Sequence, residues 1–331
     1  MRKKAYFKSV TIFLSILLVF SQLQLFSLPA YGETVSDQPL LFRSVGVAQN
    51  GTTYYVDGEG GNNANDGQSP ASAWRDFEKV NQTEFQPGDH LLLNAQSTWN
   101  NQLLHPKGNG TAAQKIVIDF YDTNDKGETI FETTRRPIIN GGGTYSTGTF
   151  KRAISGAVQL VNQEYWNISN LEVTNTPELD NLEGYKKPGD AQRAGILVLG
   201  YEQNRTFNSV TIRNNYVHDV QTEYYLNLSG NTATKRLKAV GGIIVLGSWF
   251  DENGNVVTAA NDHRTTTGFN DILIENNMIQ RVGLEGIRTK ADSDTSRGNT
   301  FYKTFSNITI RNNYLEDIAG DGIVLSEAKS G

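Results

Sequence analysis

The chain has 331 residues, a formal net charge of −5 and no cysteine. Without cysteine it has no disulfide, no zinc–thiolate site and no thiol nucleophile. The acidic balance argues against a nucleic-acid-binding surface, which needs an excess of basic residues, but it allows a local basic groove for an anionic substrate.

The N-terminal segment has the pattern of a bacterial secretory signal. Arg2, Lys3 and Lys4 precede an apolar run from Val10 to Leu28, and the small residues that follow fit a signal peptidase site. We therefore predict a signal peptide over 1–32, a flexible leader over 33–51 and one folded domain over 52–331. A membrane anchor retained in the mature protein is the alternative. The signal predicts a secreted, extracellular protein that has no membrane association after cleavage.

The folded domain is predicted to begin with a strand and a short helix. Thr52–Val56 is rich in β-forming residues, and Ser69–Val80 is predicted to be helical with Ser72 as the N-cap. One face of this helix would carry Trp74, Phe77 and Val80. A helix here would cap the β-structure that follows, whose first strand would otherwise expose an unpaired edge.

One sequence pattern recurs along the second half of the chain. Alternating apolar residues interrupted by an Asn-Asn pair occur at 210–220, 272–282 and 308–318, with a degenerate copy at 166–173. Strands that contain Gly-Ile occupy 194–200, 241–247, 285–291 and 321–327. Such repeats predict a solenoid, in which stacked coils bury a core that no coil could bury alone. An antiparallel sandwich would also give many short strands, but not copies of one strand.

The order of these motifs resembles the right-handed parallel β-helix proteins of the pectin-lyase-like superfamily. The matching residues are Tyr54–Asp57, Asp66-Gly67, Ser69-Pro70, Ala73-Trp74, Pro87–Asp89 and the Asn-Asn repeats. The resemblance implies an all-β, right-handed parallel β-helix from Thr52 onward and a polysaccharide partner. It does not select an activity, because the superfamily includes polysaccharide lyases, glycoside hydrolases, epimerases and non-catalytic adhesins.

The chain ends soon after the fourth Gly-Ile strand without a capping segment. We therefore expect a C-terminally truncated fragment of a longer protein, and we expect it to be a monomer.

Aligning the repeats separates scaffold positions from candidate functional positions. Two outward columns alternate in charge, which favours ion pairs between neighbouring coils. A third column contains asparagines suited to a left-handed corner, whose amides are predicted to bond to the next coil. The columns are Arg213, Glu275 and Arg311; Asp219, Arg281 and Asp317; and Asn170, Asn214, Asn276 and Asn312.

The repeat over 285–291 departs from the others and is the predicted active site. Arg288 and Lys290 occupy outward positions that are apolar in the two preceding Gly-Ile strands. In β-elimination on an acidic glycan, one such cation could act as the base and another could neutralise the uronate. Asp292 and Glu327 could hold a Ca²⁺ ion for the same purpose. We therefore expect a polysaccharide lyase.

Two alternatives remain open from the sequence. A glycoside hydrolase would need two carboxylates, and Glu285 and Asp321 occupy equivalent positions in adjacent coils, where stacking would bring them close. A non-catalytic carbohydrate-binding adhesin is the other alternative. In each case sugar rings could stack on or bond to loop residues, namely Trp249, Tyr224, Tyr225 and Arg264.

Overall fold

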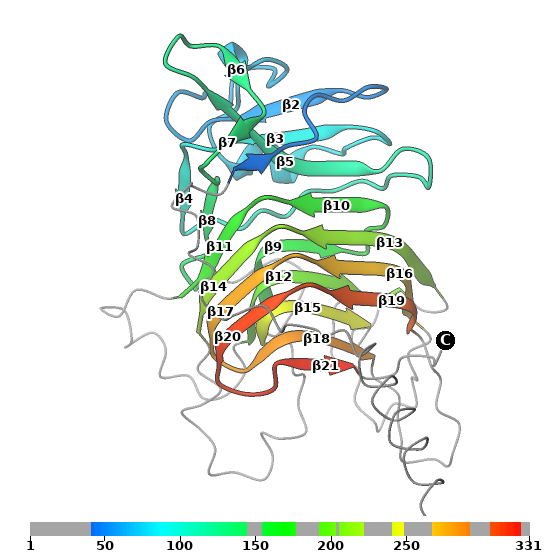
Figure 1. Cartoon of the computed structure of the whole chain (residues 1–331). Coiled ribbons are helices and arrows are strands. Elements are labelled where there is room, and N and C mark those ends of the chain that lie inside the picture. Colours follow the sequence, from blue (N-terminus) through cyan, green and yellow to red (C-terminus); the bar gives the residue numbers. More distant parts are fainter. Residues whose placement is uncertain are drawn as a thin grey trace, which may run out of the picture. The chain divides into compact units, whose positions relative to one another are not determined.

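Three parallel β-sheets form most of the structure, which is a computed structural model (Figure 1). It describes residues 41–143, 154–176, 192–202, 205–221, 240–247, 267–291 and 305–325. These all belong to one unit, Leu41–Gly331. No helix in the described ranges is long and apolar enough to cross a membrane.

Each sheet consists of strands that come from successive turns of the chain. Sheet 1 runs in the order β19 (Phe305–Arg311), β16 (Gly268–Glu275), β13 (Thr206–Arg213), β10 (Trp166–Ser169), β5 (Ile116–Thr123), β3 (His90–Asn94) and β2 (Thr53–Val56). Sheet 2 runs β20 (Tyr314–Ile318), β17 (Met278–Val282), β14 (Tyr216–Val220), β11 (Glu172–Asn175), β8 (Ile138–Asn140) and β4 (Thr98–Asn100). Sheet 3 runs β21 (Ile323–Leu325), β18 (Glu285–Ala291), β15 (Gly241–Gly247), β12 (Gln192–Gly200) and β9 (Ile154–Val161).

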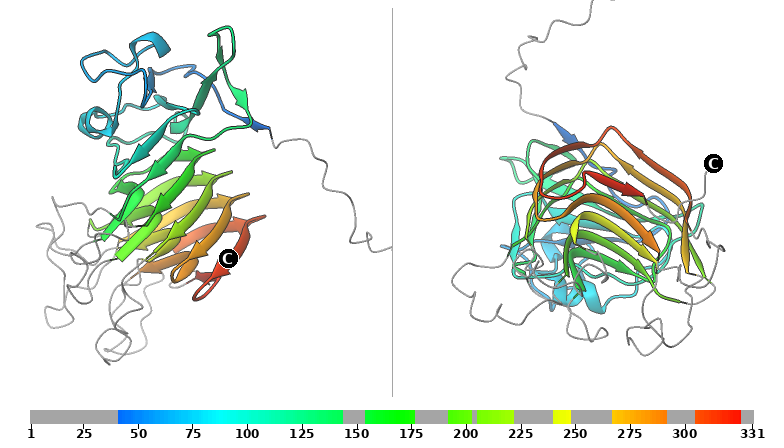
Figure 2. Two further views of the ribbon diagram at one scale, coloured as in Figure 1. Left: turned by 90° about the vertical axis from the view of Figure 1, so that its left-hand side faces the viewer. Right: turned by 90° about the horizontal axis from the view of Figure 1, so that it is seen from below.

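One turn of the chain through sheets 1, 2 and 3 is called a coil below, and the coils stack in register (Figure 2). Ile212 pairs with Ile274, and Ile274 pairs with Ile310, so equivalent repeat positions lie on top of one another. The solenoid predicted from the repeats is confirmed as an all-β, parallel fold, and the antiparallel sandwich is wrong. The inward side chains form one continuous core, in which Phe207, Phe269 and Phe305 stack with ring centroids 5.5 Å apart.

At the Asn-Asn corner between sheets 1 and 2, the two asparagines have different structural roles. The first asparagine has a positive φ, between 54° and 61° at Asn170, Asn214, Asn276 and Asn312, as the sequence predicts. The amide ladder, however, is formed by the second: Asn215 Nδ2 donates to Asn277 Oδ1 at 3.0 Å, and Asn277 Nδ2 donates to Asn313 Oδ1 at 2.9 Å. Asn215 and Asn277 are buried, and the ladder satisfies their amides inside the coils.

The glycines of the Gly-Ile strands stand where sheet 3 approaches the side chains of sheet 2. A Cβ added to Gly195, Gly242 or Gly286 would lie 2.3, 2.6 or 2.5 Å from a side-chain carbon of Val217, Ile279 or Leu315, respectively. It would also lie 2.8, 2.7 or 2.4 Å from the carbonyl oxygen of the glycine in the next coil. These positions therefore exclude any side chain.

The helix predicted near the N-terminus is divided into two pieces. A 3-10 turn, η2 (Pro70–Ser72), is capped by Ser69, and a helix, α2 (Phe77–Gln82), is capped by Asp76. The predicted N-cap Ser72 is therefore wrong. Between the pieces Ala73 is extended (ψ 148°) and Trp74 forms a parallel bridge to Val56, which interrupts the helical backbone.

Packed structure also precedes Thr52. Strand β1 (Phe42–Arg43) pairs antiparallel with β7 (Glu132–Thr133), and the Val45 amide donates to Asp119 Oδ2 at 3.0 Å. Another short antiparallel strand, β6 (Thr129–Ile130), pairs with the end of β5. Residues 41–51, which the sequence assigns to a flexible leader, thus contact the β-solenoid.

Candidate functional site

The outward face of sheet 3 forms a second apolar layer, separate from the main core. Ala194, Leu197, Leu199, Ile244 and Leu246 form one cluster, and each is at most 1% exposed. In register with these residues, β18 places Glu285 beside Gly241, Arg288 beside Ile244 and Lys290 beside Leu246. The sequence therefore predicted correctly that β18 interrupts the apolar face with polar residues. The face is buried, however, and not open to solvent.

Glu285 and Arg288 form a buried ion pair at this break. Arg288 Nη1 lies 2.6 Å from Glu285 Oε1, with side-chain exposures of 7% and 1%. Two further atoms of the pair, Glu285 Oε2 and Arg288 Nε, are buried and have no hydrogen-bond partner among the described residues. Arg288 is thus already neutralised by a carboxylate, which makes it poorly suited to serve as the base of an elimination or as the cation for a uronate.

The other predicted residues of this site lie at different depths. Lys290 is half-buried on the outward face, and Asp321 is exposed in the next coil. The Asp321 carbonyl accepts a hydrogen bond of 3.0 Å from the Gly286 amide, so stacking does bring Asp321 next to β18. Within the described residues, no hydrogen bond or ion pair joins the carboxyl groups of Glu285 and Asp321.

Six predicted residues lie outside the described ranges: Trp249, Tyr224, Tyr225, Arg264, Asp292 and Glu327. No cluster of three or more acidic or histidine side chains able to hold a metal occurs among the described residues. The calcium site therefore stays a prediction.

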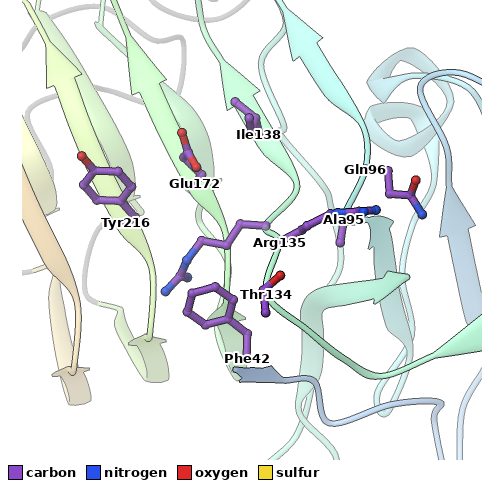
Figure 3. A pocket seen from close by; sticks show the side chains of 9 residues that line it. Phe42, Ala95, Gln96, Thr134, Arg135, Ile138, Glu172 and Tyr216 are labelled. Carbon is purple, nitrogen blue, oxygen red and sulfur yellow. The ribbon is translucent and has the colours of Figure 1, made fainter. Parts of the chain in front are cut away.

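The structure also contains a cavity of about 690 Å³ on the outward face of sheet 2 (Figure 3). Ile138, Glu172 and Tyr216 come from three neighbouring strands of the sheet, and Phe42 and Thr134–Arg136 come from the segments around β1 and β7. Ala95 and Gln96 complete its lining. Part of this wall belongs to residues that the sequence assigned to the leader, and no repeat signal marks the cavity.

A polar network continues from the cavity across sheet 2. His218 Nε2 lies 3.1 Å from Glu172 Oε1, its Nδ1 lies 2.6 Å from Asp219 Oδ2, and the Tyr216 ring stacks on the imidazole at 4.0 Å. Arg281 Nε bonds to Asp219 Oδ1 at 2.7 Å. Burial lowers the pKa of His218, but the bonds to Glu172 and Asp219 outweigh it and raise that pKa overall.

Arg281 has the largest effect on the pKa of Asp219 in this network. Its hydrogen bonds lower the pKa of Asp219 to about 2. The pairing of Asp219 with Arg281 confirms one neighbouring pair in one of the two predicted charge columns, and the 2.7 Å pair between Glu275 and Arg311 confirms one in the other. The sequence did not reveal the link from His218 to Glu172, which joins two coils.

Protonated His218 should stabilise the fold most at acidic pH. Because its folded-state pKa is raised, this contribution is complete below about pH 6.5, the unfolded value, and is lost as pH rises through the folded value. We expect His218→Gln to lower Tm by roughly 2 °C more at pH 5.5 than at pH 8.5, which corresponds to about 1 kcal/mol. Calorimetry that gives equal losses at both pH values would contradict the assignment.

The fold thus defines a parallel β-solenoid protein, and no family profile matches the chain. Comparison with known proteins nevertheless finds similar proteins. A lacto-N-biosidase from Bifidobacterium longum subsp. longum is 28% identical over 318 residues, covering 84% of this chain and 19% of that protein.

Two crystal structures of a GH136 lacto-N-biosidase from Eubacterium ramulus, native and selenomethionine-substituted, superpose with TM-scores of 0.61 and 0.60. Each is 24% identical and matches 84% of this chain and 43% of the solved chain. The superposition supports the fold, and this chain spans less than half the length of the relatives it matches.

Proposed function

We propose that the chain is part of a glycoside hydrolase that acts on an oligosaccharide containing lacto-N-biose. The observation that carries the proposal is the 28% identity to a lacto-N-biosidase, which extends over 84% of this chain. It favours the hydrolase alternative over the lyase preferred from the sequence. The buried ion pair of Arg288 with Glu285 also favours the hydrolase, because a lyase would need Arg288 as a cation available to the substrate.

Glu285 and Asp321 are the carboxylates we assign to the reaction. They stand at equivalent positions of adjacent coils, and neighbouring strands lie about 4.8 Å apart, close to the roughly 5–5.5 Å between the carboxyl groups of retaining glycosidases. Glu285, charged and oriented by Arg288, would be the nucleophile, and exposed Asp321 would be the general acid. Since the Glu285 side chain is 1% exposed, substrate binding has to make it accessible.

Hydrolysis of an aryl lacto-N-bioside by the purified protein tests this proposal. We expect release of the aryl group and the disaccharide, and loss of at least about 100-fold in rate for Asp321→Asn, whose side chain is exposed and whose backbone bond to Gly286 is retained. Polygalacturonate serves as the lyase substrate. An unsaturated, ultraviolet-absorbing product from it, with no hydrolysis of the lacto-N-bioside, would favour the lyase and refute the hydrolase.

The proposal also includes export, right-handed winding of the coils and capping of the first coil by η2 and α2. Phe77 and Val80 of α2 are buried in the main core, which supports the capping role. N-terminal sequencing of the secreted protein should begin near Glu33 if residues 1–32 are a signal peptide.

A further inference from the structure

The cavity on sheet 2 has a fixed cationic wall. The Arg136 guanidinium lies 3.8 Å from the centroid of the Phe42 ring and donates to the backbone carbonyls of Leu171 and Asn214. Burial lowers the pKa of Arg136 to about 10, although Glu172 and Asp119 oppose the shift. Arg136 is therefore held between β1 and sheet 2, where it sets the shape of the cavity before any ligand enters.

The part of the cavity lining next to Arg136 is anionic and aromatic, and it is equally constrained. Glu172 is held by His218 at 3.1 Å, and Tyr216 is fixed by stacking on the same imidazole and by a 2.8 Å hydrogen bond from its hydroxyl to Gln280. Preorganised side chains of this kind lower the entropic cost of binding. The negative charge of Glu172 is already shared with His218.

Arg135 supplies the guanidinium of the cavity that remains available to a ligand. It is exposed, it lines the cavity, and within the described part of the chain its guanidinium has neither an ion pair nor a hydrogen bond. The cavity thus presents two guanidinium groups against one carboxylate that is already paired. An arginine fork matches the two oxygens of a carboxylate, and a tyrosine ring matches the apolar face of a sugar.

We propose that this cavity binds a saccharide that carries a carboxylate, with Arg135 as the partner of the carboxylate and Tyr216 as the stacking surface. Glu172 would accept hydrogen bonds from the sugar hydroxyls. The volume of about 690 Å³ lies within the range of small-molecule sites and accommodates one or two sugar units. This site lies on sheet 2, whereas of the proposed hydrolytic carboxylates Glu285 belongs to sheet 3 and Asp321 directly precedes its strand β21, so the site would hold a second part of a glycan.

Saturation-transfer NMR with methyl β-glucuronide tests the inference. We expect transfer to the glucuronide, about tenfold weaker binding of methyl β-glucoside, and at least fivefold weaker glucuronide binding by Arg135→Ala. Arg75→Ala removes another exposed arginine, one that does not line the cavity, and should bind as the unmodified protein does.

Three results would overturn the proposal: equal binding of glucuronide and glucoside, unchanged binding by Arg135→Ala, or displacement of the glucuronide by inorganic phosphate at equal concentration, which would indicate a simple anion site. Binding is measured without turnover. Glucuronide binding can therefore be absent when the lacto-N-bioside is hydrolysed, or present when the lacto-N-bioside is not hydrolysed.

Discussion

A Gly242→Ala variant should lose about 2–3 kcal/mol of unfolding free energy, which is large for the addition of one methyl group. The new Cβ would lie 2.6 Å from Ile279 Cγ2 and 2.7 Å from the Gly286 carbonyl oxygen. The Ile279 side chain could rotate away, but the carbonyl belongs to β18 in the next coil and cannot move without disturbing the pairing of β15 with β18 inside sheet 3. Urea denaturation followed by circular dichroism would measure the loss as a lower midpoint.

Gly322→Ala is the matched control for this variant. Gly322 occupies the same repeat position in the next coil but one, and among the described residues a Cβ there would meet only Leu315 Cδ2, at an ordinary contact distance of 3.8 Å. We expect a change within about 0.5 kcal/mol. Equal losses for both variants would show that backbone propensity, rather than contact between the sheets, determines the glycine at this position.

Much of the fold could be predicted because the solenoid repeats its local rules. The pairing of Ile212, Ile274 and Ile310 follows from their equal places in three copies of one pattern. The distinction between Asn214 and Asn215 could not be predicted in this way. Both belong to every copy, and only the backbone shows that the first has the left-handed conformation while the second directs its amide into the coil.

The N-terminal coils were less predictable because they lack the repeat. Trp74 fits the helical periodicity with Phe77 and Val80, yet its backbone pairs with Val56, so a long-range bridge overrides a local preference. Phe42 likewise carries no local signal of order. It is fixed by β7 and by Arg136, which is far away in the sequence.

The candidate site on sheet 3 shows what columns of aligned residues can and cannot reveal. The register correctly placed Arg288 and Lys290 outward, because β15 and β18 pair residue by residue. The pattern carries no signal for the burial of that face, whose apolar residues in β12 and β15 are at most 1% exposed. Arg288 was therefore expected to be a cation available to substrate, whereas it is paired with Glu285, three residues earlier in the same strand.

Removing the cation of this pair should have a larger effect than removing one from a surface pair of similar length. Arg288→Met would leave Glu285 charged and buried, which is expected to cost about 3–5 kcal/mol. Arg311→Met removes the partner of Glu275, which lies 2.7 Å away, but the Arg311 side chain is 59% exposed, so the expected cost is below about 1 kcal/mol. Thermal unfolding of both variants would show whether burial makes the difference.

The double variant Glu285→Gln/Arg288→Met separates a structural role of the pair from a catalytic one. Neither side chain is then charged, so stability should recover to within about 1.5 kcal/mol of the unmodified protein. If Glu285 is the nucleophile, this variant should be folded but should hydrolyse the aryl lacto-N-bioside at least about 100-fold more slowly than the unmodified protein does. The reason is that an amide cannot form the glycosyl intermediate. A stable double variant with full activity would instead show that the ion pair has only a structural role. The nucleophile would then have to be sought elsewhere on the outward face of sheet 3.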